Sequence, residues 1–218
     1  MSPTELVARY LAERSRPRIL GLLSRLLAAA GLLLAPSSGV NLVRYLASAA
    51  QAFLLVLAFR VWDDLADRER DAVEHPDRVM VASGRAVPFV VFAVVLGIAA
   101  LVPIALATDA PQRGTALVLG AGSLAIWYRV RRSGLLGGHV VLIKYPAIAF
   151  AVAPSVPRLD LRAAATLASL YLVLCIYESF DDPALRASAR ARRIAITELA
   201  LLIPLIIATA SFSGVGLP

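Results

Sequence analysis

The chain has few of the residues that build disulfides and soft-metal sites. Its 218 residues include one cysteine, Cys175, and two histidines, His75 and His139. A single cysteine excludes an internal disulfide and any metal site made of several cysteines. Two histidines argue against a zinc site. Any metal chemistry is therefore expected to use carboxylate oxygens.

Charged residues are also scarce relative to apolar ones. They make up 17% of the chain, whereas 59% of the residues are hydrophobic and the mean hydropathy is +0.76. Soluble domains are typically about 45–50% apolar. The chain therefore has too much apolar surface for one water-soluble globule, and its length fits one domain, residues 1–218.

The basic residues are almost all arginine. The chain has 21 arginines, one lysine (Lys144) and a net charge of +7. A nucleic-acid-binding protein gathers its basic residues on one face of a soluble fold. Here they occupy short segments between apolar runs, as in proteins oriented across a membrane. We therefore predict a lipid bilayer, and no nucleic acid, as the partner.

The apolar runs predict the fold class. About 20 apolar residues cross a bilayer as a helix, and seven stretches approach that length. We expect an all-α, polytopic transmembrane bundle of about seven helices around a central apolar cavity. The first stretch also fits a cleaved signal peptide, but a long segment with two glutamates precedes it. The predicted spans are residues 19–36, 42–62, 87–107, 115–128, 139–157, 163–180 and 194–212.

Arginine counts predict the orientation. Fifteen arginines fall in the four segments that would share one side of the membrane, and three fall on the other side. The arginine-rich side is expected to be cytoplasmic. The basic N-terminal segment, residues 1–18, would then be cytoplasmic and the C-terminus would lie outside. We predict a multi-pass protein of a prokaryotic plasma membrane.

Acidic residues gather at the predicted cytoplasmic end of the second span. Seven of the 15 lie in residues 63–77. Asp63, Asp67 and Asp71 are four residues apart, so they share one helix face, and Asp64 flanks that face. Like charges at this spacing destabilise a helix unless a cation compensates them. Magnesium fits, because it binds through one or two carboxylates plus substrate phosphates. The alternative is a solvated helix end whose acids pair with nearby arginines.

A second acidic pair and several basic residues are predicted to complete the site. Glu178 and Asp182, also four residues apart, end the sixth span and could supply metal ligands from a second helix. Tyr128 and Arg132 have the same spacing at the end of the fourth span, and Arg132 could hold phosphate oxygens. Lys144 lies inside the fifth span, where a buried ammonium group is costly, so it could pair with phosphate or extend its charged end to the interface.

These motifs resemble those of the UbiA superfamily of intramembrane prenyltransferases. Asp63, Asp64, Asp67 and Asp71 match the family's N/D-D-x-x-D-x-x-x-D motif. The loop that follows, residues 75–88, is similar to the family's R-P-L-x-S-G-R segment at Arg78, Ser83, Gly84 and Arg85, although Val79 replaces a proline. Tyr128 and Arg132 look like its Y-x-x-x-K pair. Glu178 and Asp182 match its D-x-x-x-D motif, with Glu for the first Asp.

The resemblance implies a magnesium-dependent enzyme. Mg²⁺, held by the six acids, would stabilise the leaving diphosphate of an isoprenyl diphosphate, and Asp64, Asp67 and Asp71 would be catalytic. Arg78, Arg85, Tyr128, Arg132 and Lys144 would bind the diphosphate. The allylic cation would then pass to an acceptor, an aromatic ring or a lipid alcohol, whose identity the sequence leaves open.

Two alternatives remain at this point. The chain could be a terpene cyclase of the same superfamily, in which the substrate's own double bond captures the cation. It could also be a non-catalytic protein that binds or transports lipid diphosphates. The family usually has nine membrane helices and this chain has about seven, so the acceptor side of the reaction is the least defined.

Overall fold

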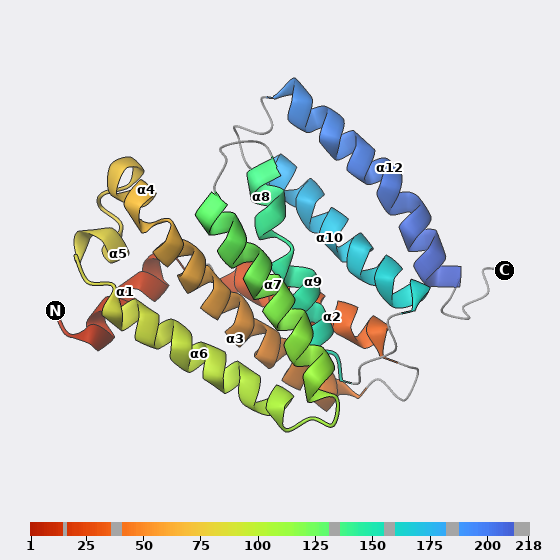
Figure 1. Ribbon diagram of the computed structural model, residues 1–218, viewed down its shortest axis with the longest axis horizontal. Helices are drawn as coiled ribbons and strands as arrows, with labels where there is room; N and C mark the ends of the chain where they lie inside the picture. The colour runs from red at the N-terminus through yellow and green to blue at the C-terminus, as the bar shows by residue number, and fades with distance from the viewer. Residues whose placement is uncertain (15–16, 36–40, 131–135, 155–159, 182–187, 212–218) are drawn as a thin grey trace.

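The computed structural model describes residues 1–14, 17–35, 41–130, 136–154, 160–181 and 188–211. All regular secondary structure in these ranges is helical, which confirms the all-α class. The helices are α1 (Pro3–Arg14), α2 (Pro17–Leu34), α3 (Leu42–Ala66), α4 (Arg68–Glu74), α5 (Val79–Ala82), α6 (Val87–Ala105), α7 (Ala110–Val130), α8 (Leu136–Val141), α9 (Lys144–Ala151), α10 (Leu161–Asp181) and α12 (Ala189–Ser211) (Figure 1).

Five of the described helices are long and apolar enough to cross a membrane. They are α2, α3, α6, α10 and α12. Large hydrophobic side chains are exposed along them, as a lipid-facing surface requires. On α6, for example, Val91, Val95 and Ile98 are exposed. This set is compatible with a multi-pass membrane protein.

The other two predicted spans form helices of a different kind. Residues 115–128 lie in α7, which has 21 residues but includes Arg113, Arg129 and three glycines that lower its hydropathy. The predicted span 139–157 is broken into α8 and α9. Pro146 has no N–H to donate to the carbonyl of Leu142, so an unbroken helix is not stable there. Instead the Tyr145 N–H donates to that carbonyl over 3.0 Å, in a tighter turn.

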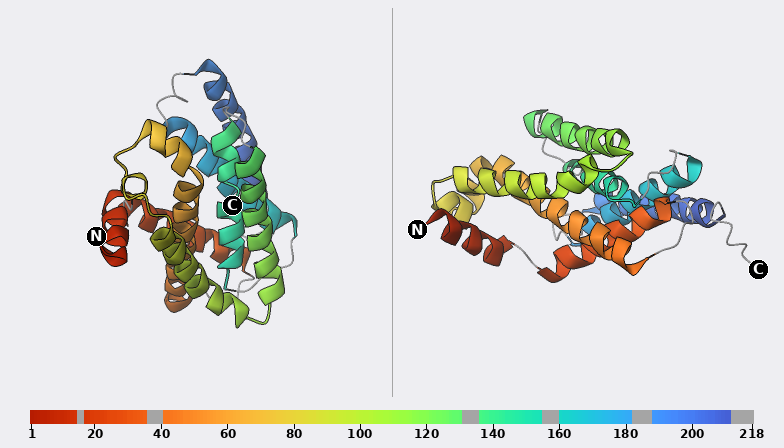
Figure 2. Two further views of the ribbon diagram at one scale, coloured as in Figure 1. Left: turned by 60° about the vertical axis from the view of Figure 1, so that its left-hand side comes forward. Right: turned by 90° about the horizontal axis from the view of Figure 1, so that it is seen from below.

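The helices pack around a core that α3 and α9 share. α3 lies against α2, α6 and α9, while α9 also contacts α7 and α10. The buried core cluster includes Val56, Phe59, Leu124, Ile148 and Leu174, which come from four different helices, α3, α7, α9 and α10. α10 and α12 run side by side as an antiparallel pair at one edge of the bundle (Figures 1 and 2).

The basic N-terminal segment forms a docked helix. Leu6 and Tyr10 of α1 are 1% exposed and pack with Val61, Met80 and Phe89. The rings of Tyr10 and Phe89 have centroids 5.4 Å apart. α1 therefore covers the end of the bundle where α3 ends and α6 begins (Figure 1).

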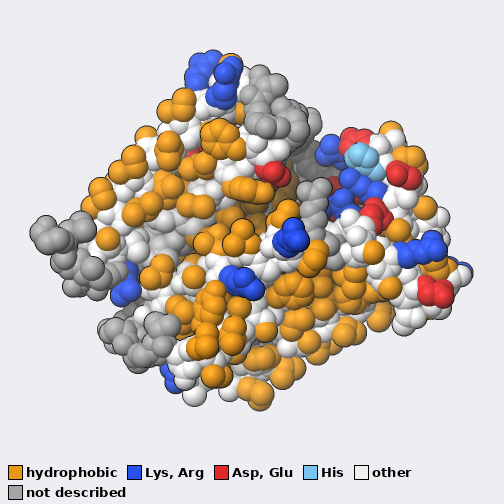
Figure 3. All heavy atoms as spheres, turned by 180° about the vertical axis from the view of Figure 1, so that it is seen from behind, with side chains coloured by type: hydrophobic (Ala, Val, Ile, Leu, Met, Phe, Trp, Pro, Cys, Tyr) orange, Lys and Arg blue, Asp and Glu red, His pale blue; other side chains and the backbone are white. Residues whose placement is uncertain are grey.

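Charge is concentrated at one end of the molecule. Seen from behind, the face is mostly hydrophobic, while acidic, basic and histidine side chains crowd one end (Figure 3). This is the end at which α1, α4 and α5 lie (Figures 1 and 2). A bilayer would hold the apolar part and leave this end in water.

Candidate active site

A cavity of about 910 Å³ lies where α3, α7 and α10 end and α8 and α9 meet. Five acidic and five basic side chains line it, together with two tyrosines and one tryptophan. Its charged lining residues are Asp63, Asp64, Asp67, Glu74, Glu178, Arg14, Arg60, Arg70, Arg78 and Lys144. Four separate parts of the sequence thus bring charge to one hollow.

Asp63 is held from two sides. The Tyr128 hydroxyl donates to its Oδ1 and the Lys144 ammonium donates to its Oδ2. Lys144 is 3% exposed and Asp63 is 8% exposed. The break between α8 and α9 positions this contact, because Lys144 begins α9 directly after the turn. The buried ammonium, for which the sequence indicated phosphate, therefore pairs here with a carboxylate.

Asp64 is bound to the N-terminal helix. The Tyr10 hydroxyl donates to its Oδ2 over 2.7 Å, and Arg14 donates to both oxygens, with distances of 2.6 Å and 3.1 Å. Arg60, one turn earlier on α3, stands 3.6 Å from Oδ2. Burial beside Asp64 raises the pKa of Tyr10, and the hydrogen bond to Asp64 raises the pKa of Arg14. Both groups therefore remain protonated donors at neutral pH.

The predicted aspartate face continues past the end of α3. The N–H groups of Asp67 and Asp71 donate to the carbonyls of Asp63 and Asp67 over 2.9 Å and 2.8 Å, so helical spacing is kept between α3 and α4. Asp67 lines the cavity. Asp71 is not among the lining residues; it is buried and its Oδ1 lies 2.5 Å from Arg78, which does line the cavity.

The loop after α4 is held by contacts with the N-terminal segment. Glu13 accepts a hydrogen bond of 2.9 Å from the N–H of Val79, which ties α1 to the start of α5. Gly84 has a φ of 65°, a conformation that glycine adopts without the steric cost paid by other residues. This turn directs Arg85 outward, where it is exposed and donates to the Met1 carbonyl over 3.3 Å.

Glu178 enters the cavity from α10. It faces Gly138 of α8, where a β-carbon would stand 3.8 Å from Cγ of Glu178. Three aspartates of the first acidic motif and Glu178 of the second thus line one cavity from different helices. Arg132 and Asp182, which were also predicted for the site, lie outside the described residues.

Of the predicted site residues, Asp63, Asp64, Asp67, Arg78, Tyr128, Lys144 and Glu178 line the cavity, whereas Asp71 and Arg85 do not. Sequence reasoning missed Tyr10 and Arg14. Their spacing of four residues on a helix of low hydropathy was the available signal, because it places a donor pair on one face. Nothing local, however, identifies Asp64, 50 residues beyond Arg14, as their acceptor.

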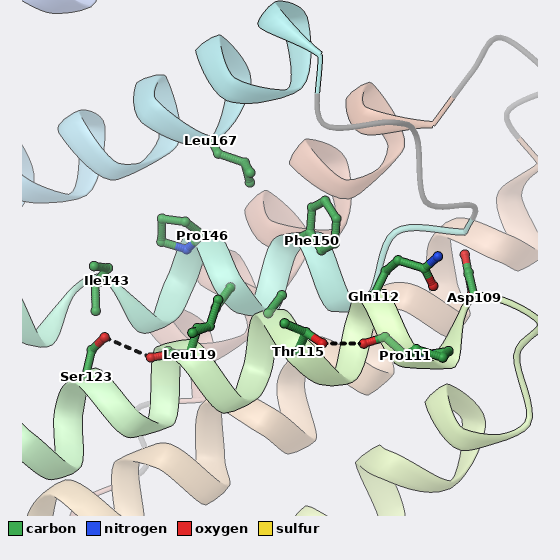
Figure 4. Close-up of a pocket in the computed structure, with 13 residues that line it drawn as sticks. Asp109, Pro111, Gln112, Thr115, Leu119, Ser123, Ile143, Pro146, Phe150 and Leu167 are labelled. Carbon is green, nitrogen blue, oxygen red and sulfur yellow. Dashed lines mark hydrogen bonds between the residues drawn. The ribbon is translucent and has the colours of Figure 1, made fainter.

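A second, mainly apolar cavity of about 700 Å³ lies between α7 and α9. Figure 4 shows Thr115, Leu119 and Ser123 of α7 on one wall, Pro146 and Phe150 of α9 on the other. Successive turns of α7 line the two cavities. Ser123 lines the apolar one and Trp127, one turn further along α7, lines the charged one.

The oxygen-rich donor set of the charged cavity suits a hard cation. Mg²⁺ takes carboxylate and phosphate oxygens and retains several waters. Both oxygens of Asp63 and of Asp64 already accept bonds from protein groups. Asp67 and Glu178 also line the cavity, and they bring carboxylates to it from two different helical regions, α3–α4 and α10.

Comparison of the chain with models of protein families, with curated proteins and with solved structures found no match in any of the three.

Proposed function

We propose that the chain is a magnesium-dependent intramembrane prenyltransferase. It ionises an isoprenyl diphosphate in the charged cavity and transfers the prenyl group to an aromatic or lipid-alcohol acceptor. The observation that carries this proposal is the balanced lining of five acidic and five basic side chains. Carboxylates alone would suit a cation and arginines alone an anion. A magnesium diphosphate requires both.

Each kind of side chain has a distinct role. Asp67 and Glu178, one from each acidic motif, would hold Mg²⁺, which would supply Lewis-acid stabilisation of the departing diphosphate. Arg78 and Lys144 donate to phosphate oxygens, and their present partners, Asp71 and Asp63, keep them in place until the substrate arrives. Asp63 and Asp64 would become available to the metal if their basic partners donated to phosphate instead.

The reaction breaks one C–O bond and forms another bond at the same carbon. The bond between the allylic carbon and the diphosphate oxygen breaks, and the electron pair leaves with the diphosphate. A ring carbon or hydroxyl oxygen of the acceptor attacks the cation and then loses its proton to the diphosphate or to water. Fixed charges that point at the leaving group stabilise it without having to reorganise during the reaction.

The apolar cavity would receive the isoprenoid chain. It begins one helical turn from Trp127, so a chain extending from the diphosphate along α7 would pass Ser123, Leu119 and Thr115 in succession. This requires α7 and the broken α8–α9 segment to lie in the membrane. The proposed bundle therefore has seven membrane segments, with the two cavities between them.

The test is product analysis with purified protein. The protein is incubated with Mg²⁺ and labelled prenyl diphosphates of several chain lengths, with and without aromatic and lipid-alcohol acceptors. Diphosphate release that requires an acceptor supports a transferase. A cyclic hydrocarbon or alcohol formed without an acceptor would assign the chain to the cyclases. No release under any condition would contradict both activities and favour a lipid-diphosphate binder.

Matched variants test the site. Asp67→Asn removes one charge from a cavity-lining carboxylate and is expected to abolish magnesium-dependent turnover. Asp77→Asn makes the same change at an exposed position outside the lining and should leave turnover unchanged. Equal activity of the two variants would contradict the proposed metal site. Chelation of Mg²⁺ should stop the wild-type reaction, and added Mg²⁺ should restore it.

A further inference from the structure

A second cluster of side chains, of residue types that can bind metals, lies next to the charged cavity. His139 of α8, Cys175 of α10 and Glu198 of α12 bring one ligand atom each within 4.8 Å of one another. Their exposed fractions are 6%, 0% and 8%. α8, α10 and α12 lie together at one side of the bundle (Figure 1). The sequence argued against a zinc site, because the chain has only two histidines and one cysteine.

The cluster has an unsatisfied group at its centre. Oε1 of Glu198 stands 3.3 Å from Nδ1 of His139, but Oε2 of Glu198 is buried without a hydrogen-bond partner among the described residues. A buried carboxylate oxygen without a partner is costly. Glu198 also lies midway along a candidate membrane span, where an ionisable residue usually has a function.

The geometry suits a tetrahedral ion. Zinc lies about 2.0–2.2 Å from nitrogen and oxygen ligands, so two such ligands of one tetrahedral ion are roughly 3.3 Å apart. The separation between His139 and Glu198 equals this value. The other ring nitrogen, Nε2, stands 3.3 Å from Oγ of Ser179. With Nε2 protonated and donating to Ser179, Nδ1 presents its lone pair to the ion, as metal-bound histidines generally do.

We propose that His139, Cys175 and Glu198 bind a zinc-class divalent ion. Charge supports this choice. The thiol releases its proton to water on binding, so a thiolate, a carboxylate and a neutral imidazole leave the bound ion electrically neutral. Neutrality matters in the bilayer interior, where a net charge is expensive. Thiolate and imidazole favour zinc over magnesium, which distinguishes this site from the charged cavity.

The site would brace the wall of the charged cavity. Gly138 and Glu178 line that cavity; Gly138 precedes His139 in sequence, and Glu178 precedes Ser179, the hydrogen-bond partner of His139. An ion bound to α8, α10 and α12 would fix the C-terminal helix against the two helices that carry these lining residues. Tyr171 supports the same arrangement by donating to the His139 carbonyl over 3.0 Å.

The test is Co²⁺ titration of the purified, chelator-stripped full chain in detergent. The expected result is one Co²⁺ per chain with a cobalt–thiolate charge-transfer band that excess Mg²⁺ does not remove. Cys175→Ser should abolish the band, and Ser179→Ala should weaken binding about 10–100-fold. His75→Gln changes an exposed histidine and should have no effect. Absence of the band in the wild type would overturn the proposal.

Two further results separate a built site from an adventitious thiol. His139→Gln and Glu198→Gln should each weaken Co²⁺ binding; unchanged affinity in both would overturn the proposal. If a variant does not fold, protection of Cys175 in the wild-type protein tests the site instead. Zn²⁺, but not Mg²⁺, should slow the alkylation of Cys175 in mild denaturant, and equal rates with both ions would contradict the site. These measurements do not depend on prenyl-transfer activity.

Discussion

The buried pair of Lys144 and Asp63 gives the sharpest prediction for stability. Lys144→Met removes the ammonium group and leaves the Asp63 carboxylate with only Tyr128 as its described donor. Removing one partner of a buried ion pair costs about 3–5 kcal/mol, because the remaining charge is not compensated. In a chain of this size each kcal/mol lowers Tm by about 2–4 °C. We therefore expect a fall of roughly 6–20 °C.

A double-mutant cycle isolates the pair. Asp63→Asn alone leaves the ammonium group of Lys144 without its carboxylate partner and should also be destabilising. Asp63→Asn combined with Lys144→Met removes both charges, so the Tm of the double variant should be closer to that of the wild type than the Tm of either single variant. The assay is thermal unfolding of the purified protein in one detergent. Arg70→Met is the control. Arg70 and its partner Glu74 are both exposed, and exposed ion pairs contribute little to the free energy of unfolding. Additive losses in the double variant would refute the reasoning.

Three further predictions concern packing, the N-terminal helix and topology. Gly120→Ala should destabilise the bundle by about 1–3 kcal/mol, because its β-carbon would stand 2.8 Å from a side chain of α9; Gly122→Ala, which meets nothing within 4 Å, should instead be neutral or stabilising by up to about 1 kcal/mol in the same unfolding assay. Tyr10→Phe should cost about 1.5–3 kcal/mol by removing a buried hydrogen bond to Asp64, and an unchanged Tm would contradict that bond's contribution. A reporter inserted at Ser133 should read as cytoplasmic if α7 and α8–α9 cross the membrane; an extracytoplasmic signal would mean that only the five long apolar helices cross it.

Hydropathy and residue spacing predicted the parts of the fold that depend on interactions between residues close in sequence. The apolar runs of membrane length correspond to α2, α3, α6, α10 and α12. Such a run can be recognised from its own length and composition, without knowing which other helices it packs against. The four-residue spacing from Asp63 to Asp67 kept its helical register. The break before α9 was foreseeable in principle, since Pro146 lacks the N–H that a continuous helix requires, but hydropathy alone predicted an unbroken span.

The sequence by itself determined that the chain is helical, that several of its helices are apolar enough to cross a membrane, and that acidic residues end two of its helices. Only the tertiary structure decided which side chains meet. It brought Arg14 to Asp64 and Lys144 to Asp63, and it gathered His139, Cys175 and Glu198 from three helices. Periodicity indicates the face of a helix on which a residue lies. The neighbour on that face is set by the packing of whole helices, which no local spacing records.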